Sequence, residues 1–159
     1  MTKVEFTQMT DLRHKTEVLA MMEALYTEDK SLPPADFSKF PRTIDTLVAQ
    51  PSRGRIVLFN EDGMPRGYAL LIPYWSNEFG GTIVHVDEMF VVPALRNRGI
   101  GRNFFRFLDE TRPFGAVALA LEVSPANAGA RRLYESLGFT LRENAALTYR
   151  FAEATSRKK

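Results

Sequence analysis

The sequence predicts an α/β (α+β) fold in which a mixed, mostly antiparallel sheet is flanked by about four helices. Three observations lead to this prediction: a short strand and two helical patterns come first, three strand-like runs follow, and a helix–strand–helix pattern with two closing strands comes last. The 159 residues are 45% hydrophobic and 25% charged, which is ordinary for a globular protein. We expect one domain over residues 3–151, followed by a polar, basic tail at 152–159.

The first third is expected to contain a short strand and two helices. The strand spans Val4–Thr7, and the first helix begins at Thr10 or Asp11. Apolar residues recur in that helix every three or four positions, at Leu12, Val18, Met22 and Leu25. The second helix runs from about Asp36 to Gln50 and stops before Pro51, with an apolar side of Ile44, Leu47 and Val48.

Three strands are predicted in the middle of the chain, at Ile56–Asn60, Gly67–Trp75 and Thr82–Val92. Glycine-containing turns of a few residues join them, so we expect an antiparallel meander. Pro73 cannot donate a ladder hydrogen bond, and we therefore expect the middle strand to be shorter than its apolar run.

The last third alternates between helices and strands. A helix is expected from just after Gly99 to about Thr111, and another from Asn127 to Leu137, ended by Gly138. The continuous apolar run Ala116–Val123 is typical of a buried parallel strand. Two further strands, Phe139–Arg142 and Leu147–Phe151, are expected to close the chain.

Composition excludes several kinds of chemistry. Without cysteine the chain forms no disulfide, thiolate metal site or covalent cysteine intermediate, so any acyl transfer is direct. His14 and His85 lack metal-ligand spacing, and no metal is expected. A net charge of +2 indicates neither nucleic acid nor membrane as a partner. With no signal-like segment, cytoplasmic residence is the expectation.

The most informative stretch is Arg96-Asn97-Arg98-Gly99-Ile100-Gly101, between a strand and a helix. Glycines admit a ligand close to the backbone, and the free N–H groups of a helix start attract anions. Arg98 and Arg102 lie beside those amides. A plain tight turn is the alternative, whereas a Rossmann fingerprint fails at Phe104 and a P-loop lacks its Lys-Ser/Thr.

This loop resembles the GNAT acetyltransferase superfamily, whose Arg/Gln-x-x-Gly-x-Gly/Ala signature is met by Arg96, Gly99 and Gly101. Residues Val123–Phe139 resemble a second family motif, Val-x-x-x-Asn-x-x-Ala-x-x-Leu-Tyr-x-x-x-Gly-Phe. The close resemblance covers about Asp87 to Phe139. Asp87 and Glu88, just before the loop, look most like those of the diamine and small-amine acetyltransferases.

The resemblance implies acetyl-coenzyme A (acetyl-CoA) as co-substrate and a set of residues that bind it. The strand backbone at Phe90, Val91 and Val92 would pair with the pantetheine arm. The pyrophosphate would lie on Asn97, Arg98, Gly99, Ile100, Gly101 and Arg102. Asn127 would also contact coenzyme A, and Tyr134 would lie near the sulfur.

An amine acceptor needs a base. At pH 7, deprotonating an amine with the lysine reference pKa costs about 4.6 kcal/mol. Strand alternation predicts Val84, Val86, Glu88, Phe90 and Val92 on one face, and burial there would raise the pKa of Glu88 toward a useful range. Asp87 would then anchor the amine. The family resemblance suggests the opposite allocation, and either acid is alternatively an ordinary satisfied carboxylate.

Tyr134 is the candidate acid for the leaving thiolate, although its apolar neighbours also suit an ordinary core tyrosine. The resulting expectation is direct N-acetylation of a primary amine on a small molecule or peptide, through a ternary complex. A non-catalytic coenzyme A-binding module and a nucleotide-binding domain are the alternatives. Analogy with the fold class suggests a homodimer.

Overall fold

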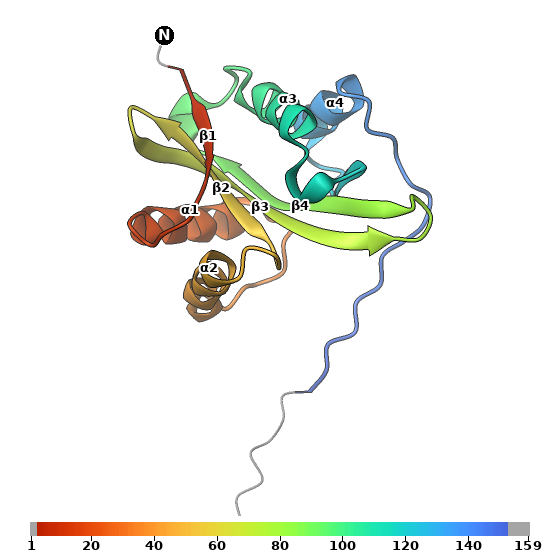
Figure 1. Cartoon of the computed structure of the whole chain (residues 1–159), viewed down its shortest axis with the longest axis horizontal. Helices are drawn as coiled ribbons and strands as arrows, with labels where there is room; N and C mark the ends of the chain where they lie inside the picture. Colours follow the sequence, from red (N-terminus) through yellow and green to blue (C-terminus); the bar gives the residue numbers. More distant parts are fainter. Residues whose placement is uncertain (1–2, 153–159) are drawn as a thin grey trace, which may run out of the picture.

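A computed structural model describes residues 3–152 and contains a five-stranded sheet with helices on both faces (Figure 1). The sheet is covered by α1 and α2 on one face and by α3 and α4 on the other. The elements are β1 (Glu5–Gln8), α1 (Lys15–Glu28), α2 (Phe40–Ala49), β2 (Arg55–Glu61), β3 (Met64–Ser76), β4 (Gly81–Val91), α3 (Ile100–Thr111), β5 (Ala118–Leu121) and α4 (Ala128–Ser136).

The sheet has the predicted mixed topology. Its spatial order is β1-β2-β3-β4-β5; the first four strands pair antiparallel, and β5 lies parallel to β4. Helix α3 makes the crossover that a parallel pair requires. Asp62 and Gly63, with φ of 52° and 76°, form the predicted tight turn between β2 and β3.

Each face of the sheet carries its own hydrophobic core. On one face, α1 and α2 pack through Val18, Met21, Met22, Ile44 and Leu47. On the other, α3 packs through Ile100, Phe104, Phe105 and Leu108. The strands serve both cores because successive side chains point to opposite faces: Val57 and Leu71 face α3, whereas Leu58 and Leu70 face the α1–α2 layer.

Two elements are longer or shorter than the sequence predicts. Strand β3 continues through Pro73, which pairs with Val84. Pairing with β2 ends at Leu71, so Pro73 lies where β3 is an edge strand and a missing N–H costs little. Helix α1 begins only at Lys15, because Asp11 forms a local turn with Arg13 and leaves Leu12 about half exposed.

The second predicted helix is divided near its start. A single 3₁₀ turn, Phe37–Lys39, precedes α2, and the side chain of Asp36 accepts a hydrogen bond from the Ser38 N–H. Pro41 then lies in the first turn of α2, where proline is well tolerated. The predicted apolar side is correct, with Ile44 and Leu47 buried.

The prediction for the end of the chain is wrong in two respects. Strand β5 is four residues long and only half-buried, since it lies at the sheet edge and pairs with β4 alone. The predicted strands Phe139–Arg142 and Leu147–Phe151 are not formed: residues 139–152 contain no helix or strand. Strand pairing requires a neighbour with free backbone groups, and within residues 3–152 this segment pairs with no strand.

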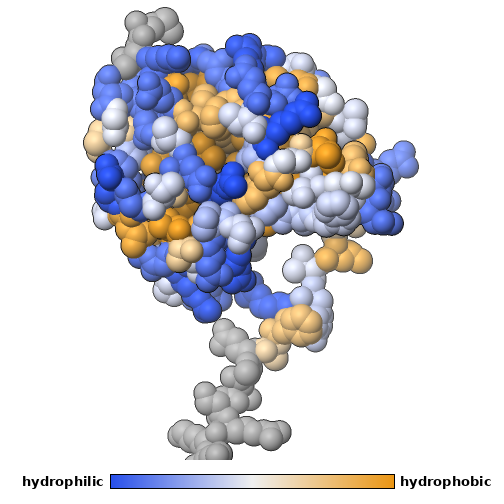
Figure 2. All heavy atoms as spheres, in the orientation of Figure 1, coloured by the Kyte–Doolittle hydropathy of each residue, from blue (hydrophilic) through white to orange (hydrophobic). Residues whose placement is uncertain are grey.

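The segment after α4 is held at its start, where Phe139 packs against Phe105 and Arg142 pairs with Glu78, and it then exposes apolar residues at its surface (Figure 2). Four of its large side chains are at least three-quarters exposed: Leu141, Leu147, Tyr149 and Phe151. The predicted basic tail at 152–159 lies outside the described residues except for Ala152. Within residues 3–152, no helix combines the length and apolar character needed to cross a bilayer.

Candidate active site

A β-bulge at Asp87 sets the geometry of the candidate site. Glu88 pairs with Leu70 and Val86 pairs with Leu71, so Asp87 is an extra residue on β4. The bulge reverses which residues face which layer: Val86 packs in the α3 core, whereas Phe90 packs in the α1–α2 core. The predicted alternation, which put Val86, Glu88 and Phe90 on one face, is therefore wrong beyond Val86.

Glu88 is held by two tyrosines from different elements. The hydroxyl of Tyr26, in the last turn of α1, donates to Glu88 Oε1 at 2.8 Å. The hydroxyl of Tyr68, on β3, donates to Glu88 Oε2 at 2.7 Å. These contacts place the carboxyl group on the α1–α2 side of the sheet, with a phenol hydroxyl at each oxygen.

Burial raises the pKa of Glu88 above the ordinary glutamate value. The hydrogen bonds from Tyr68 and Tyr26 lower it, because they stabilise the carboxylate, and the negative charge of Asp87 raises it again. Burial and the nearby carboxylate also raise the pKa of both tyrosines, so their hydroxyls stay protonated and continue to donate. A carboxylate with a raised pKa suits a general base.

Asp87 has a more open environment than Glu88. Its side chain is half exposed, and its Oδ1 lies 3.7 Å from Nε2 of His85. His85 pairs with Ile72, which packs on the α1–α2 core, so His85 belongs to the same side of the sheet as Glu88. Two carboxyl groups therefore lie close together at the bulge, one buried and one accessible.

The second half of β4 has an open edge. Strand β5 pairs with β4 only from Ile83 to Val86. The N–H of Val92 donates to the Arg66 carbonyl on the β3 side, and antiparallel alternation therefore leaves Met89 and Val91 facing the open edge. Among the three residues predicted to bind pantetheine, Val91 has its backbone toward this edge, whereas the Phe90 side chain is buried beneath it.

The glycine loop leads directly into α3. Asn97 and Gly99 have φ of 60° and 75°, a left-handed conformation that turns successive backbone N–H groups toward one side. Helix α3 starts at Ile100 without a side-chain cap, which leaves its first N–H groups available. A Cβ on Gly101 would lie 3.0 Å from Leu133, so this glycine also permits close packing of α4 on α3.

The arginines of the loop have separate partners. Arg96 forms a bidentate ion pair with Glu28 at the end of α1, and its Nε donates to the Val91 carbonyl at 2.8 Å. Arg102 donates to the Ser136 hydroxyl at 2.8 Å and so connects α3 to α4. Both arginines reach across to other elements from the loop region.

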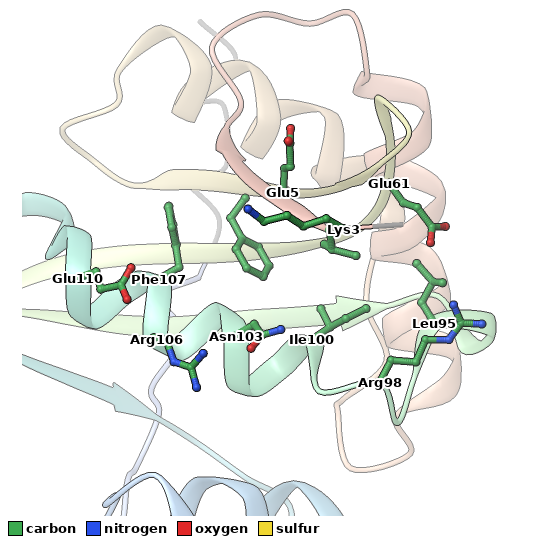
Figure 3. Close-up of a pocket in the computed structure, with 12 residues that line it drawn as sticks. Lys3, Glu5, Glu61, Leu95, Arg98, Ile100, Asn103, Arg106, Phe107 and Glu110 are labelled. Atoms are coloured by element: carbon green, nitrogen blue, oxygen red, sulfur yellow. The ribbon is translucent and has the colours of Figure 1, made fainter. Parts of the chain in front are cut away.

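Arg98 lines a separate cavity of about 820 Å³ between β1 and α3 (Figure 3). Its wall carries positive, negative and apolar side chains, including Arg106, Glu61 and Phe107. Neither Glu88 nor Tyr134 belongs to this lining. The cavity is therefore distinct from the carboxyl groups at the bulge.

Tyr134 and Asn127 lie on α4 and at its start. The Tyr134 ring packs edge-on against Phe105 and Phe139, and burial raises the pKa of its hydroxyl. Its hydroxyl therefore stays protonated near neutral pH. The side chain of Asn127 accepts from the Ala130 N–H at 3.1 Å and caps α4.

Sequence reasoning did not identify Tyr26, Tyr68 or the Glu28–Arg96 pair. Tyr26 is 62 residues from Glu88 and Tyr68 is 20 residues away, so only strand register and helix placement bring them together. Nor does any motif signal the bulge. Across residues 3–152, no group of three or more histidine, aspartate and glutamate side chains is arranged to hold a metal ion.

Comparison with known proteins gives a family match and several relatives. The acetyltransferase (GNAT) family profile matches residues 19–139, more than half of the chain. The chain is 34% identical over 109 residues to an L-methionine sulfoximine/L-methionine sulfone acetyltransferase of Salmonella typhimurium, a match that covers 63% of each protein. It is 48% identical over 75 residues to the [ribosomal protein bS18]-alanine N-acetyltransferase of the same organism, covering 42% of this chain and 51% of that protein.

Each of these two matches spans less than two thirds of the relative's length. Among solved structures, the aminoglycoside N-acetyltransferase AAC(6')-Iy in complex with CoA has a TM-score of 0.76. It is 17% identical, and the match covers 96% of this chain and 97% of that one. At this identity the likeness concerns the fold.

Proposed function

This chain belongs to the GNAT acetyltransferase family, and from that premise we propose that it transfers an acetyl group from acetyl-CoA directly to a primary amine. One observation carries the proposal: a single strand, β4, has both an open backbone edge and the buried carboxyl group of Glu88. The open edge suits the amides of an extended donor. The carboxyl group suits the proton of an attacking amine.

The donor would lie along the open edge of β4 with its phosphates at the start of α3. The N–H groups of Met89 and Val91 and the C=O group of Met89 face that edge and would pair with amide groups of the pantetheine arm, whereas the Val91 C=O accepts from Arg96. The N–H groups from Asn97 to Arg102 would bind the pyrophosphate, which a helix start favours. Arg98 would add positive charge, and Asn127 would hold the start of α4 beside coenzyme A.

The chain's own groups then divide the proton transfers. Asp87, which is accessible, holds the cationic amine. Glu88 accepts the first proton, which frees the nitrogen lone pair that forms the new carbon–nitrogen bond. The Tyr134 hydroxyl donates a proton to the sulfur as the carbon–sulfur bond breaks, and the second proton that the nitrogen loses restores that hydroxyl. The opposite allocation of the two acids is tested by comparing their variants.

The acceptor is a primary amine of a small molecule or peptide. This class is supported by the negative charge of Asp87 at the accessible side of the bulge. The names of the relatives suggest particular members of it: methionine sulfoximine or sulfone, and a peptide that begins with alanine. A diamine, which the motif at Asp87 suggests, is the third member.

We also propose that the chain forms a homodimer. The exposed apolar side chains Leu147, Tyr149 and Phe151 alternate with the polar residues Thr148 and Arg150. Such alternation is typical of a β-strand whose apolar side is covered by another part of the protein. By analogy with the fold class, a second copy of the chain would supply that cover.

The experiment has a binding step and a turnover step. Thermal unfolding is followed with and without acetyl-CoA, because a ligand that binds the folded state raises the unfolding temperature. Release of free thiol is then measured with methionine sulfoximine, an alanyl peptide and spermidine as acceptors. We expect stabilisation by acetyl-CoA and thiol release with at least one amine.

The outcomes separate the remaining functions. Stabilisation by acetyl-CoA without thiol release across a broad amine panel would indicate a non-catalytic coenzyme A-binding module. Stabilisation by NAD and not by acetyl-CoA would indicate a nucleotide-binding domain. No stabilisation at acetyl-CoA concentrations far above micromolar would contradict the proposal.

A further inference from the structure

Glu88 depends on two phenol hydroxyls for its orientation. Each carboxyl oxygen accepts one hydroxyl hydrogen bond, from Tyr26 at 2.8 Å and from Tyr68 at 2.7 Å. A carboxylate oxygen has about two acceptor positions, so each oxygen keeps one for an incoming N–H group. The two tyrosines thus fix where the remaining acceptor positions point.

The two tyrosines differ in how they are held. Tyr68 lies in the sheet itself, paired with Phe90, and its side chain is fully buried. Tyr26 comes from the last turn of α1, is half-buried, and packs against Phe40 with ring centroids 5.0 Å apart. Its hydrogen bond to Glu88 therefore depends on where the end of α1 lies relative to β4.

A second contact holds that helix end in place. Glu28, two residues after Tyr26, forms the bidentate ion pair with Arg96. Arg96 in turn binds the Val91 carbonyl and lies over the Phe90 ring, 5.3 Å from its centroid. The end of α1 is thus connected to β4 at two points: the Tyr26 hydroxyl bonds to Glu88 itself, and Arg96 links Glu28 to Val91, three residues further along the strand.

We propose that Tyr26 is a positioning residue for Glu88, and that the Glu28–Arg96 ion pair keeps Tyr26 in register with it. The inference rests on the proposed role of Glu88 as the base. Tyr26 acts through the carboxyl group: it stabilises the ionised form and sets the direction from which an amine proton is accepted. Arg96 begins the glycine loop, so the same arginine connects the donor loop to the base.

The proposal predicts a shift in the ionisation of Glu88. The ionisable groups that face it are Tyr26 from α1, Tyr68 from β3 and Asp87 from its own strand, with His85 beside Asp87. Burial raises the pKa of Glu88 and the Tyr26 hydrogen bond lowers it, so removal of the hydroxyl should raise this pKa further. A hydrogen bond to a charged group changes an equilibrium roughly tenfold or more, and the Glu88 titration midpoint should rise by about one pH unit.

The first test uses Tyr26→Phe in the full-length chain and needs no turnover. The carboxyl ¹³C signal of Glu88, assigned by its loss in Glu88→Gln, is titrated in wild type and variant. Tyr74→Phe is the matched control, since Tyr74 is about half exposed on β3 and, among residues 3–152, donates to no carboxylate. We expect a higher midpoint in Tyr26→Phe alone; an unchanged midpoint overturns the proposal.

The second test measures kcat/KM against pH with the best acceptor. The acidic limb of the pH profile should shift to higher pH in Tyr26→Phe, as the ¹³C midpoint does. It should stay at the wild-type pH in Tyr74→Phe. If the midpoint moves but no amine is acetylated by any form of the protein, the proposed function fails and the positioning role stands. If turnover is normal and its acidic limb does not move, the positioning role fails alone.

The ion pair has its own variant and control. Glu28→Gln should raise the Glu88 midpoint by less than Tyr26→Phe does, because the hydroxyl remains but the helix end is held less firmly. Asp45→Asn removes the Lys15–Asp45 ion pair at the other end of α1 and should leave the midpoint unchanged. Equal midpoints in these two variants would remove Glu28 and Arg96 from the proposal.

Discussion

At the scale of single residues, Glu88 takes its properties from its surroundings. Burial raises its pKa, and two phenol hydroxyls lower it by stabilising the carboxylate. Its neighbour Asp87 is half exposed and lies beside His85. Adjacent residues of one kind thus have different environments, which suits two different roles in handling an amine.

Substitution of Glu88 tests the proposed base. Glu88→Gln should lower kcat/KM by roughly 100-fold or more, the size of effect expected when a general base is lost. Thermal stabilisation by acetyl-CoA should persist, because the donor would bind along the open backbone edge of β4 and at the start of α3, without a bond to this carboxyl group. Asp109→Asn, on the exposed face of α3, is the control; if Asp87→Asn had the larger effect, the roles of the two acids would be exchanged.

Substitution of Tyr134 tests the proposed acid. Tyr134→Phe retains the packing against Phe105 and Phe139 but removes the hydroxyl. We expect turnover to fall roughly 100-fold, within the range for loss of a general acid, with little change in the affinity for acetyl-CoA measured by calorimetry. Unchanged turnover would assign Tyr134 to the core alone.

The raised pKa of Glu88 also predicts how stability depends on pH. The folded state holds its proton to higher pH than the unfolded state, whose glutamate titrates near 4.5. Between the pKa of Glu88 in the unfolded state and its higher pKa in the folded state, the folded protein binds more protons than the unfolded protein. The contribution of Glu88 to stability therefore falls as the pH rises through this interval. Glu88→Gln should lose less stability than wild type between pH 4.5 and 7. If the free energy of unfolding changed with pH by the same amount in wild type and Glu88→Gln, the raised pKa of Glu88 would be contradicted.

At the scale of elements, the bulge in β4 and the glycine loop before α3 position the site. The extra residue at Asp87 turns Glu88 toward the α1–α2 layer, whereas Val86 faces α3. Beyond the bulge, β4 loses its pairing with β5 and gains an open edge. One irregularity therefore accompanies both the buried carboxyl group and the exposed backbone.

Two glycines permit a matched test of the loop. Gly99 and Gly63 have φ of 75° and 76°, and a Cβ on either would meet no other atom of the described residues within 4 Å. Alanine at each position should therefore lower the free energy of unfolding by a similar amount, roughly 1–2 kcal/mol. Gly99→Ala should also weaken acetyl-CoA binding roughly tenfold, since its Cβ would enter the space proposed for the phosphates. Equal affinities in the two variants would exclude the loop from donor binding.

At the scale of the whole molecule, helices cover both faces of the sheet, but the edge formed by β5 stays partly exposed. Strand β5 has one neighbour, and its residues are only half-buried. The chain that follows α4 exposes Leu147, Tyr149 and Phe151 almost fully. Burying three such side chains contributes about 1.5–3 kcal/mol each, which would offset part of the freedom that two chains lose on association.

Light scattering after size exclusion tests this association. Replacing Leu147, Tyr149 and Phe151 with serine should halve the mass of the particle, because the apolar contact with a second copy is lost. Conservative changes at the alternate positions, Thr148→Ser with Arg150→Gln, should leave a dimer. A monomeric wild-type protein would contradict the homodimer directly.

Much of this architecture follows from local patterns in the sequence. The antiparallel meander, the helix that starts at Ile100 and the helix capped by Asn127 are confirmed. Apolar periodicity, glycine turns and capping residues act within a few residues of one another, so they are visible in a single sequence. The same holds for the two motifs on which the family resemblance depends.

The tertiary structure alone decided the environment of the site. The bulge that reverses the faces of β4 carries no motif, and the partners of Glu88 come from α1 and β3. The closing strands were predicted from alternation but are not formed, because a strand also needs a partner. Local sequence thus determined the elements and the glycine loop, whereas contacts between distant residues decided how Glu88 is buried and held, since register and packing arise only when the whole chain is folded.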